Sequence, residues 1–192
     1  MKMISNKIFN KFKLLLIVVL SLFVLTNVDA QIRKSKSVTV VKVEKTPRSK
    51  VVYLNKNRRV RTVTTLPRRA KVVRYNGIAF HYYDGVFYQK RSGTVAIVNA
   101  PRGIKVSHIP GNYRRIAING MNYFYVNGLF YKKQGNYYEI VSPQVGLLVQ
   151  NLPDGAEKIS IDSVIYYEYA DTFYRLVETE NGLAYKVMGV IG

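Results

Sequence analysis

A spacing of 43 residues recurs along this chain and constrains its fold more than any other feature. Three prolines, each preceded by Leu or Ile, keep this spacing: Pro67, Pro110 and Pro153. Three Phe-Tyr pairs keep it as well, and they end at Tyr88, Tyr131 and Tyr174. A fixed period of this size indicates consecutive supersecondary units, each of which buries an apolar face against a neighbour.

The middle copy predicts a three-stranded antiparallel meander. Asn119-Gly120 and Asn127-Gly128 are favoured in two-residue type I′ turns, because both turn residues need a positive φ. Short runs of alternating aromatic and branched residues flank these turns, and a two-residue turn sets Val126 opposite Leu129. We therefore predict an all-β protein of tandem short antiparallel meanders, about 43 residues each, as SH3-like or small-barrel units.

The alternation divides each meander into two faces. In the middle copy, one face carries Tyr123, Tyr125 and Phe130, and we expect it to be buried. The opposite face carries Val126 and Tyr131 and is too aromatic for an ordinary solvent-facing surface. It either packs between neighbouring units or forms an exposed tyrosine platform for a glycan or peptide. The candidate platform residues are Tyr83, Tyr88, Tyr131, Tyr167, Tyr169 and Tyr174.

Residues 1–30 have the pattern of a secretory signal peptide. A lysine-rich start precedes the apolar run Leu14–Leu25, and small residues favour cleavage between Ala30 and Gln31. A retained membrane anchor is the alternative, but the run is shorter than the roughly 20 residues that span a bilayer. The chain has no cysteine, which excludes disulfides, thiolate metal sites and a lipidated N-terminal cysteine. We expect an exported protein, periplasmic or associated with the outer membrane, with an extracellular location as the alternative, and without a transmembrane span in its mature form.

The segment before the first copy is strongly basic. Residues 31–74 hold 15 Lys or Arg and a single acid, whereas residues 75–192 hold 11 Lys or Arg and nine acids. We divide the mature chain into a basic arm and linker (31–59), with a linker at 45–50, and three copies (60–100, 101–142 and 143–192). The candidate binding cations are Arg58, Arg59, Arg61, Arg68, Arg69 and Lys71.

Such an arm attracts polyanions at long range. In an exported protein, the expected partner is an anionic envelope component, namely a lipid headgroup, lipopolysaccharide or acidic polysaccharide, or else an acidic protein. Nucleic acid is not expected, and the sequence does not indicate an oligomeric state. The alternative is a solvated arm that only keeps the protein soluble.

Catalytic and metal-binding patterns are sparse. His81 stands where the other copies have Phe124 and Tyr167, so we expect it to pack, and His108 reads as a polar loop residue. No metal site, cofactor or nucleophile motif is expected. Glu168 replaces a tyrosine on the face expected to be buried, and we interpret it as an exposed edge of the last copy. The prediction is a non-enzymatic protein; an envelope enzyme using scattered acids is the least favoured reading.

Four motifs of the middle copy, Ile109-Pro110, Gly120–Tyr125, Gly128–Tyr131 and Tyr138–Val141, resemble a tandem-repeat domain of unknown function. That family occurs in exported proteins of Gram-negative bacteria, and the resemblance spans residues 60–190. It implies no activity and no site residues. The last copy departs from the motif at Ser163 and Asp171, which replace turn glycines, so we expect looser hairpins there. The predicted role is structural or binding in the envelope, with glycan or peptidoglycan binding through tyrosines as the alternative.

Overall fold

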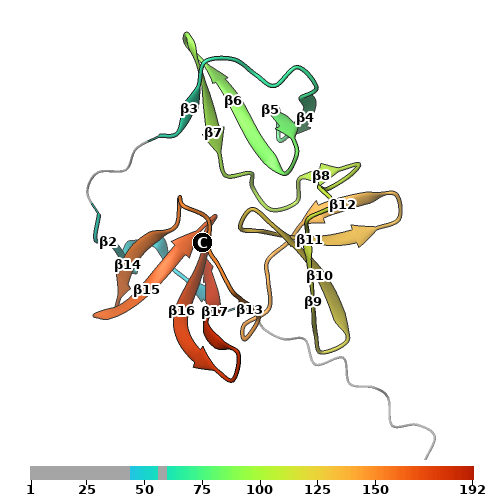
Figure 1. The fold of residues 1–192 in the computed structure, drawn as a ribbon. Helices are drawn as coiled ribbons and strands as arrows, with labels where there is room; N and C mark the ends of the chain where they lie inside the picture. Colours follow the sequence, from blue (N-terminus) through green and yellow to red (C-terminus); the bar gives the residue numbers. More distant parts are fainter. Residues whose placement is uncertain (1–43, 56–59) are drawn as a thin grey trace, which may run out of the picture. The chain divides into compact units, whose positions relative to one another are not determined.

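The computed structural model describes residues 44–55 and 60–192, which form three β sheets (Figure 1). The only helix of these residues is one turn of 3₁₀ helix, η1 (Arg48–Lys50). The prediction of an all-β fold built from antiparallel meanders is therefore confirmed. In the described part of the chain, no helix is long and apolar enough to cross a membrane.

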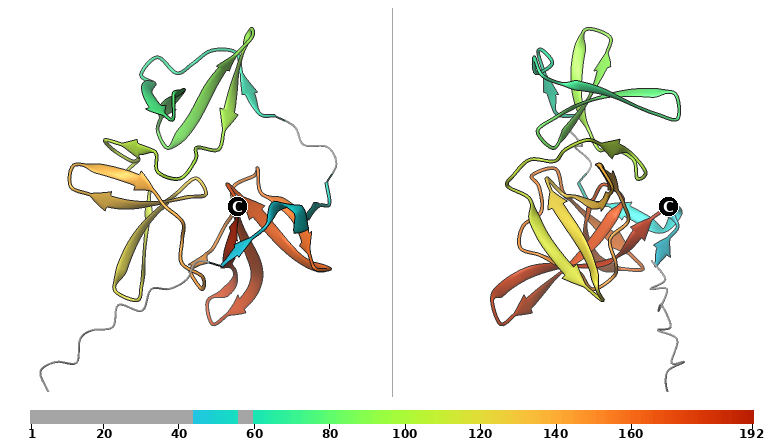
Figure 2. Two further views of the ribbon diagram at one scale, coloured as in Figure 1. Left: turned by 180° about the vertical axis from the view of Figure 1, so that it is seen from behind. Right: turned by 90° about the vertical axis from the view of Figure 1, so that its right-hand side faces the viewer.

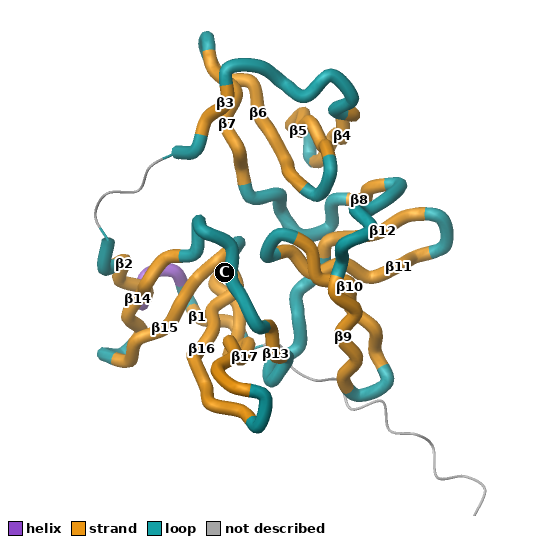
Figure 3. The backbone as a smooth tube through the Cα atoms, in the orientation of Figure 1, coloured by secondary structure: helices purple, strands orange, loops and turns teal. Residues whose placement is uncertain are grey.

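The first sheet is antiparallel throughout, with the strand order β3-β7-β6-β5-β4. Hydrogen bonds join β4 to β5, β5 to β6 and β6 to β7, while β3 lies beside β7 and leaves β4 at the far edge (Figure 3). The bounds are β3 (Thr62–Val63), β4 (Lys71–Tyr75), β5 (Ile78–Tyr83), β6 (Val86–Arg91) and β7 (Thr94–Val98).

The second sheet has the same plan, with the order β8-β12-β11-β10-β9. Val126 faces Leu129 and Phe124 faces Tyr131, as the two-residue turn predicted. The strands are β8 (Lys105–Val106), β9 (Arg114–Ile118), β10 (Met121–Val126), β11 (Leu129–Gln134) and β12 (Tyr137–Ile140). The strands β8 to β11 begin and end 43 residues after their counterparts β3 to β6.

The third sheet combines the C-terminal strands with an N-terminal segment. Its main order is β1-β17-β16-β15-β14-β2, and β13 also pairs with β17. The C-terminal strands are β13 (Leu148–Val149), β14 (Glu157–Ile161), β15 (Val164–Tyr169), β16 (Thr172–Thr179) and β17 (Gly182–Ile191).

The N-terminal strands of this sheet are β1 (Lys45–Thr46) and β2 (Val51–Tyr53). β1 runs parallel to the end of β17, and β2 runs antiparallel to β14, so the two strands lie beside C-terminal strands in both views of Figure 2. The expected linker at 45–50 is therefore wrong, because these residues supply β1 and η1.

The two-residue turns require positive φ angles, which explains where glycine occurs and which residues replace it. Asn127 and Gly128 both have a positive φ, as the type I′ prediction requires. Ala170 and Asp171 keep positive φ values of 50° and 59° at the equivalent place in the third sheet, without glycine. Tyr169 still faces Thr172 across this turn. The turn therefore keeps two residues and the same backbone conformation without glycine.

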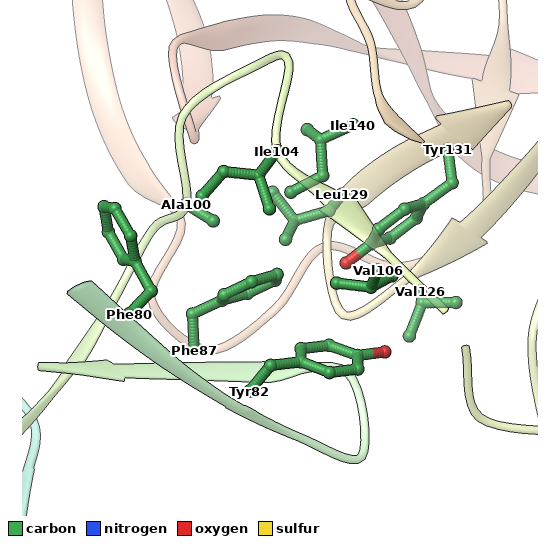
Figure 4. Packing of buried hydrophobic residues seen from close by; sticks show 10 residues of the cluster. All are labelled: Phe80, Tyr82, Phe87, Ala100, Ile104, Val106, Val126, Leu129, Tyr131 and Ile140. Carbon is green, nitrogen blue, oxygen red and sulfur yellow. The ribbon is translucent and has the colours of Figure 1, made fainter. Parts of the chain in front are cut away.

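Each sheet packs one face against the opposite face of the next sheet. Tyr82 and Phe87 of the first sheet share a buried cluster with Val126, Leu129 and Tyr131 of the second sheet (Figure 4). In the same way, Tyr123 and Phe130 of the second sheet pack with Tyr169 and Tyr174 of the third. A third cluster closes the last sheet, where Val51 and Tyr53 of β2 pack with Ile159, Ile161 and Phe173. The aromatic second face is thus a packing surface between sheets.

Candidate binding surfaces

The six candidate platform tyrosines are mostly inaccessible. Tyr131 and Tyr174 are 0% exposed, Tyr88 and Tyr169 are also buried, and Tyr167 is half-buried. Tyr83 alone among the six is exposed, at 39%. Stacking on a sugar needs an open ring face, so the proposed platform is corrected: neighbouring sheets or strands cover most of its rings.

Tyrosines of the other face instead join successive sheets by hydrogen bonds. The Tyr82 hydroxyl donates to the backbone carbonyl oxygen of His108 at 3.0 Å, and the Tyr125 hydroxyl donates to that of Asn151 at 3.0 Å. Burial raises the pKa of Tyr82 to about 12 and also raises the pKa of Tyr125. These bonds were not predicted, although the 43-residue spacing of both partners was visible in the sequence.

The second turn of each meander fits closely against the next sheet. A Cβ added to Gly85 would lie 2.7 Å from Val126, and one added to Gly128 would lie 2.6 Å from Pro153 and closer still to the Tyr169 ring. Glycine is therefore needed at both positions, because the backbone has a positive φ and because a side chain would collide with the next sheet. The third sheet has no following sheet in the described chain, and Asp171 stands at that position.

Asp171 ties this last turn to two arginines. Its carboxylate forms an ion pair with Arg48, and this hydrogen bond raises the pKa of the Arg48 guanidinium. Its carbonyl oxygen accepts a hydrogen bond from Nη2 of Arg102 at 2.8 Å. Asp171 thus anchors the turn through charge where the other two turns use close packing.

Glu168 is buried, at 5% exposure, which corrects its interpretation as an exposed edge. Its Oε1 accepts a hydrogen bond from the backbone N–H of Asp171 at 2.7 Å, so the carboxylate stabilises the turn. Glu157 lies directly opposite on β14. Residues 44–55 and 60–192 contain no group of three or more His, Asp or Glu residues placed to hold a metal ion.

The two histidines lie on the strand β5 and in the loop that follows β8. His81 is half-buried on β5 opposite Tyr88, and His108 is exposed in a loop, with its ring 5.8 Å from that of Tyr82. Ser107 Oγ lies 3.2 Å from Nδ1 of His108. His81 thus has the strand position expected of a packing residue, and His108 has that of a loop residue.

Exposed cations gather on the first sheet. Arg68 and Arg69 lie in a turn that the Ala70 N–H closes on the Pro67 carbonyl oxygen at 2.9 Å, and Lys71 and Arg74 follow on the edge strand β4. Charged residues on an edge strand also oppose pairing with another chain, which is their alternative role. Arg58, Arg59, Ala30 and Gln31 lie outside the described residues.

Charge differs between the sheets. Residues 60–100, which form the first sheet, carry seven Lys or Arg and one acid, while residues 44–55 and 143–192, which form the third sheet, carry six Lys or Arg and eight acids. The ion pairs Arg48–Asp171 and Lys50–Asp162 both belong to the third sheet and its connecting turns. The first sheet therefore carries an excess of six positive charges.

Arg61 stands apart from the other candidate cations, because it lines two adjoining hollows of about 300 and 270 Å³. Both hollows contain Ile97, Val98, Asn99 and Tyr169. The Arg61 side chain lies beside Gly155, in the turn before β14 of the third sheet. A Cβ added to Gly155 would lie 3.7 Å from one guanidinium nitrogen of Arg61. No feature of the sequence alone brought these residues together.

Comparison with protein families finds one match. Residues 55–191 match a family described as a family of unknown function, DUF6515. No curated protein and no solved structure matches the chain. The comparisons therefore assign no activity, and the surfaces described above carry the functional argument.

Proposed function

Since the chain belongs to the DUF6515 family, whose function is unknown, we propose its role from its own residues. It is an exported, non-enzymatic β-repeat protein of the cell envelope that attaches to an anionic envelope component. Its three sheets serve as the scaffold, and residues 1–30 direct its export to the periplasm or the outer membrane.

The observation that carries this proposal is the cluster of four exposed cations at residues 68–74. Arg68, Arg69, Lys71 and Arg74 follow one another along a turn and the edge strand β4, in a sheet that holds a single acid, Asp84. Holding these cations on a folded turn and on the two faces of an edge strand lowers the entropy lost on binding compared with a fully unfolded arm. The basic residues at 31–59 add to the same field at long range.

The chemistry of these side chains favours phosphate and carboxylate groups. Arginine binds both in a bidentate manner, and lysine contributes a point charge. Lipid headgroups, lipopolysaccharide and acidic polysaccharides carry such groups, and an acidic protein is the further candidate. The acidic third sheet would be repelled by the same surface, so the charge difference between the sheets favours attachment through the first sheet.

Vesicle sedimentation tests the proposal. The chain without its predicted signal peptide is mixed with vesicles of neutral lipid or of neutral lipid containing phosphatidylglycerol, at low and at high salt. We expect sedimentation only with the anionic vesicles, and release at high salt because exposed charges are screened. Replacing Arg68, Arg69, Lys71 and Arg74 by Glu abolishes sedimentation.

The matched control changes exposed cations of the third sheet. Arg175→Glu with Lys186→Glu alters surface charge on β16 and β17 without touching the first sheet. This variant is expected to sediment like the parent or slightly less. If both variants lost sedimentation equally, the effect would depend on the net charge of the protein and not on the position of the cations. Sedimentation that persists when residues 68, 69, 71 and 74 are Glu would contradict the proposal.

A further inference from the structure

Arg61 occupies a backbone position that is apolar in the other two copies. Ile104 and Leu147 lie 43 and 86 residues later; both are 1% exposed and fill the buried clusters between successive sheets. The equivalence extends to the backbone, because the carbonyl oxygens of Arg61, Ile104 and Leu147 accept hydrogen bonds at 2.8, 2.9 and 2.8 Å from equivalent strands. At this place the first sheet therefore presents a guanidinium where the others present a packed side chain.

Glu168 shows the complementary change on the third sheet. It stands where Tyr82 and Tyr125 reach across to the next sheet through their hydroxyl groups. Arg61 and Glu168 line the same hollow, of about 270 Å³. Two positions that join successive sheets in the other copies thus carry charged side chains here, and both side chains line this hollow.

The rest of the lining is polar without a strong net charge. Arg91 and Glu157 add one more charge of each sign, Asn99 adds a carboxamide, and Tyr169 adds a phenol. Ile97 and Val98 supply an apolar part of the wall. The adjoining hollow contributes one further acid, Asp154, and one further carboxamide, Asn127.

We propose that this hollow, between Arg61 and Glu168, binds a neutral mono- or disaccharide. Guanidinium, carboxylate and carboxamide groups together supply donors and acceptors for several hydroxyl groups, and the nearly balanced charge gives no preference for an ion. The apolar wall suits the C–H face of a sugar ring. The volume of about 270 Å³ lies just below the usual range of about 300–1,000 Å³ for small-molecule pockets, and the adjoining hollow adds about 300 Å³.

This site is independent of the cations at residues 68–74. The tyrosine faces that the sequence suggested for glycan binding are mostly buried, whereas this hollow between the first and third sheets is open. Binding of saccharide and attachment to anionic surfaces can therefore be lost separately, and Glu replacements at residues 68–74 are expected to leave saccharide binding intact.

Amide NMR of the ¹⁵N-labelled chain without its predicted signal peptide tests the site. Maltose, cellobiose and N,N′-diacetylchitobiose are the neutral probes, and glucuronate and glutamate are the charged comparators. We expect at least one neutral sugar to shift the amides of Asn99, Gly155 and Tyr169, with no comparable shift from either charged compound. Asn99→Ala is expected to weaken the affinity at least tenfold.

A matched pair of variants on β6 separates lining from surface effects. Arg91 lines the hollow, whereas Lys90 points to the other face of the strand. Arg91→Ala should weaken saccharide binding, while Lys90→Ala should not, and thermal unfolding shows whether each variant is folded. Absence of binding by all three sugars, tighter binding of a charged compound, or equal loss in the two variants would each overturn the proposal.

Discussion

The hydroxyl group of Tyr82 donates a hydrogen bond to the backbone carbonyl oxygen of His108 at 3.0 Å, which joins the first sheet to the segment leading into the second. The same bond recurs between Tyr125 and Asn151, one sheet later. Tyrosines of the face that the sequence predicts to be buried therefore join each sheet to the next by a hydrogen bond. Its partner is a backbone atom, so the bond itself does not depend on which side chain stands at position 108.

Replacing Tyr82 by Phe tests this bond. The variant keeps the ring in its buried cluster and removes only the donor, so the free energy of unfolding should fall by about 1 kcal/mol. Urea denaturation measures the change. The neighbouring Tyr83→Phe is the control, because Tyr83 is 39% exposed; its stability should be unchanged. Equal losses in the two variants would show that the hydrogen bond does not stabilise the fold.

The opposite result is expected for Tyr131→Phe. The Tyr131 hydroxyl is buried, and no described residue forms a hydrogen bond with it (Figure 4). An unsatisfied buried hydroxyl is destabilising, so its removal should leave stability unchanged or raise it by about 1 kcal/mol. Denaturation of Tyr131→Phe beside Tyr82→Phe compares two tyrosines of one cluster. A loss as large as that in Tyr82→Phe would contradict this view of Tyr131.

Gly128→Ala should be more harmful than Gly120→Ala. Both glycines have a positive φ, which costs about 1–2 kcal/mol for alanine. Only at Gly128 does the added methyl meet other atoms, because Pro153 and the Tyr169 ring lie against it, whereas Gly120 has nothing within 4 Å. Overpacking should add about 1–3 kcal/mol. Thermal unfolding of the two variants measures the difference, and equal effects would rule out the close contact.

Stability should fall in alkaline solution between about pH 10 and about pH 12. Burial raises the pKa of Tyr82 to about 12, and it also raises those of Tyr131 and Tyr174. An unfolded tyrosine ionises near pH 10. Above that pH the unfolded state releases protons that the folded state still holds, so stability present below about pH 10 is lost as the pH rises toward about 12.

Urea midpoints at a series of pH values, followed together with tyrosinate absorbance, measure this loss. Tyr82→Phe should show a smaller alkaline loss than the parent, because one shifted group is absent. A parent midpoint that stays constant up to pH 12 would contradict the prediction.

The sequence predicted the meanders because their signals are local. Asn127-Gly128 specifies a turn, the turn sets Val126 opposite Leu129, and alternation then defines two faces. The choice between packing and exposure for the second face could not be made locally, since it depends on a sheet about 43 residues away. The apolar, aromatic character of that face was nevertheless the correct sign of burial.

The missed features all depend on contacts that are distant in sequence. The strand β1 is two residues long and pairs with the end of β17, so no local pattern marks it. Glu168 looked exposed because a carboxylate is rarely buried, but the N–H of Asp171 satisfies it within the same turn. Arg61 and Glu168 are separated along the chain, and only the fold places both beside one hollow.

The pairing of Thr46 with Ile191 has a consequence for the order of folding. The first and second sheets form from neighbouring segments, which closes short loops and proceeds rapidly. The third sheet needs its first strand from the start of the described chain and its last strand from the end, so the longest loop must close before it is complete. A chain synthesised only as far as β16 can form the first two sheets. In the third sheet, β1 and β16 both lack their shared neighbour until β17 is made.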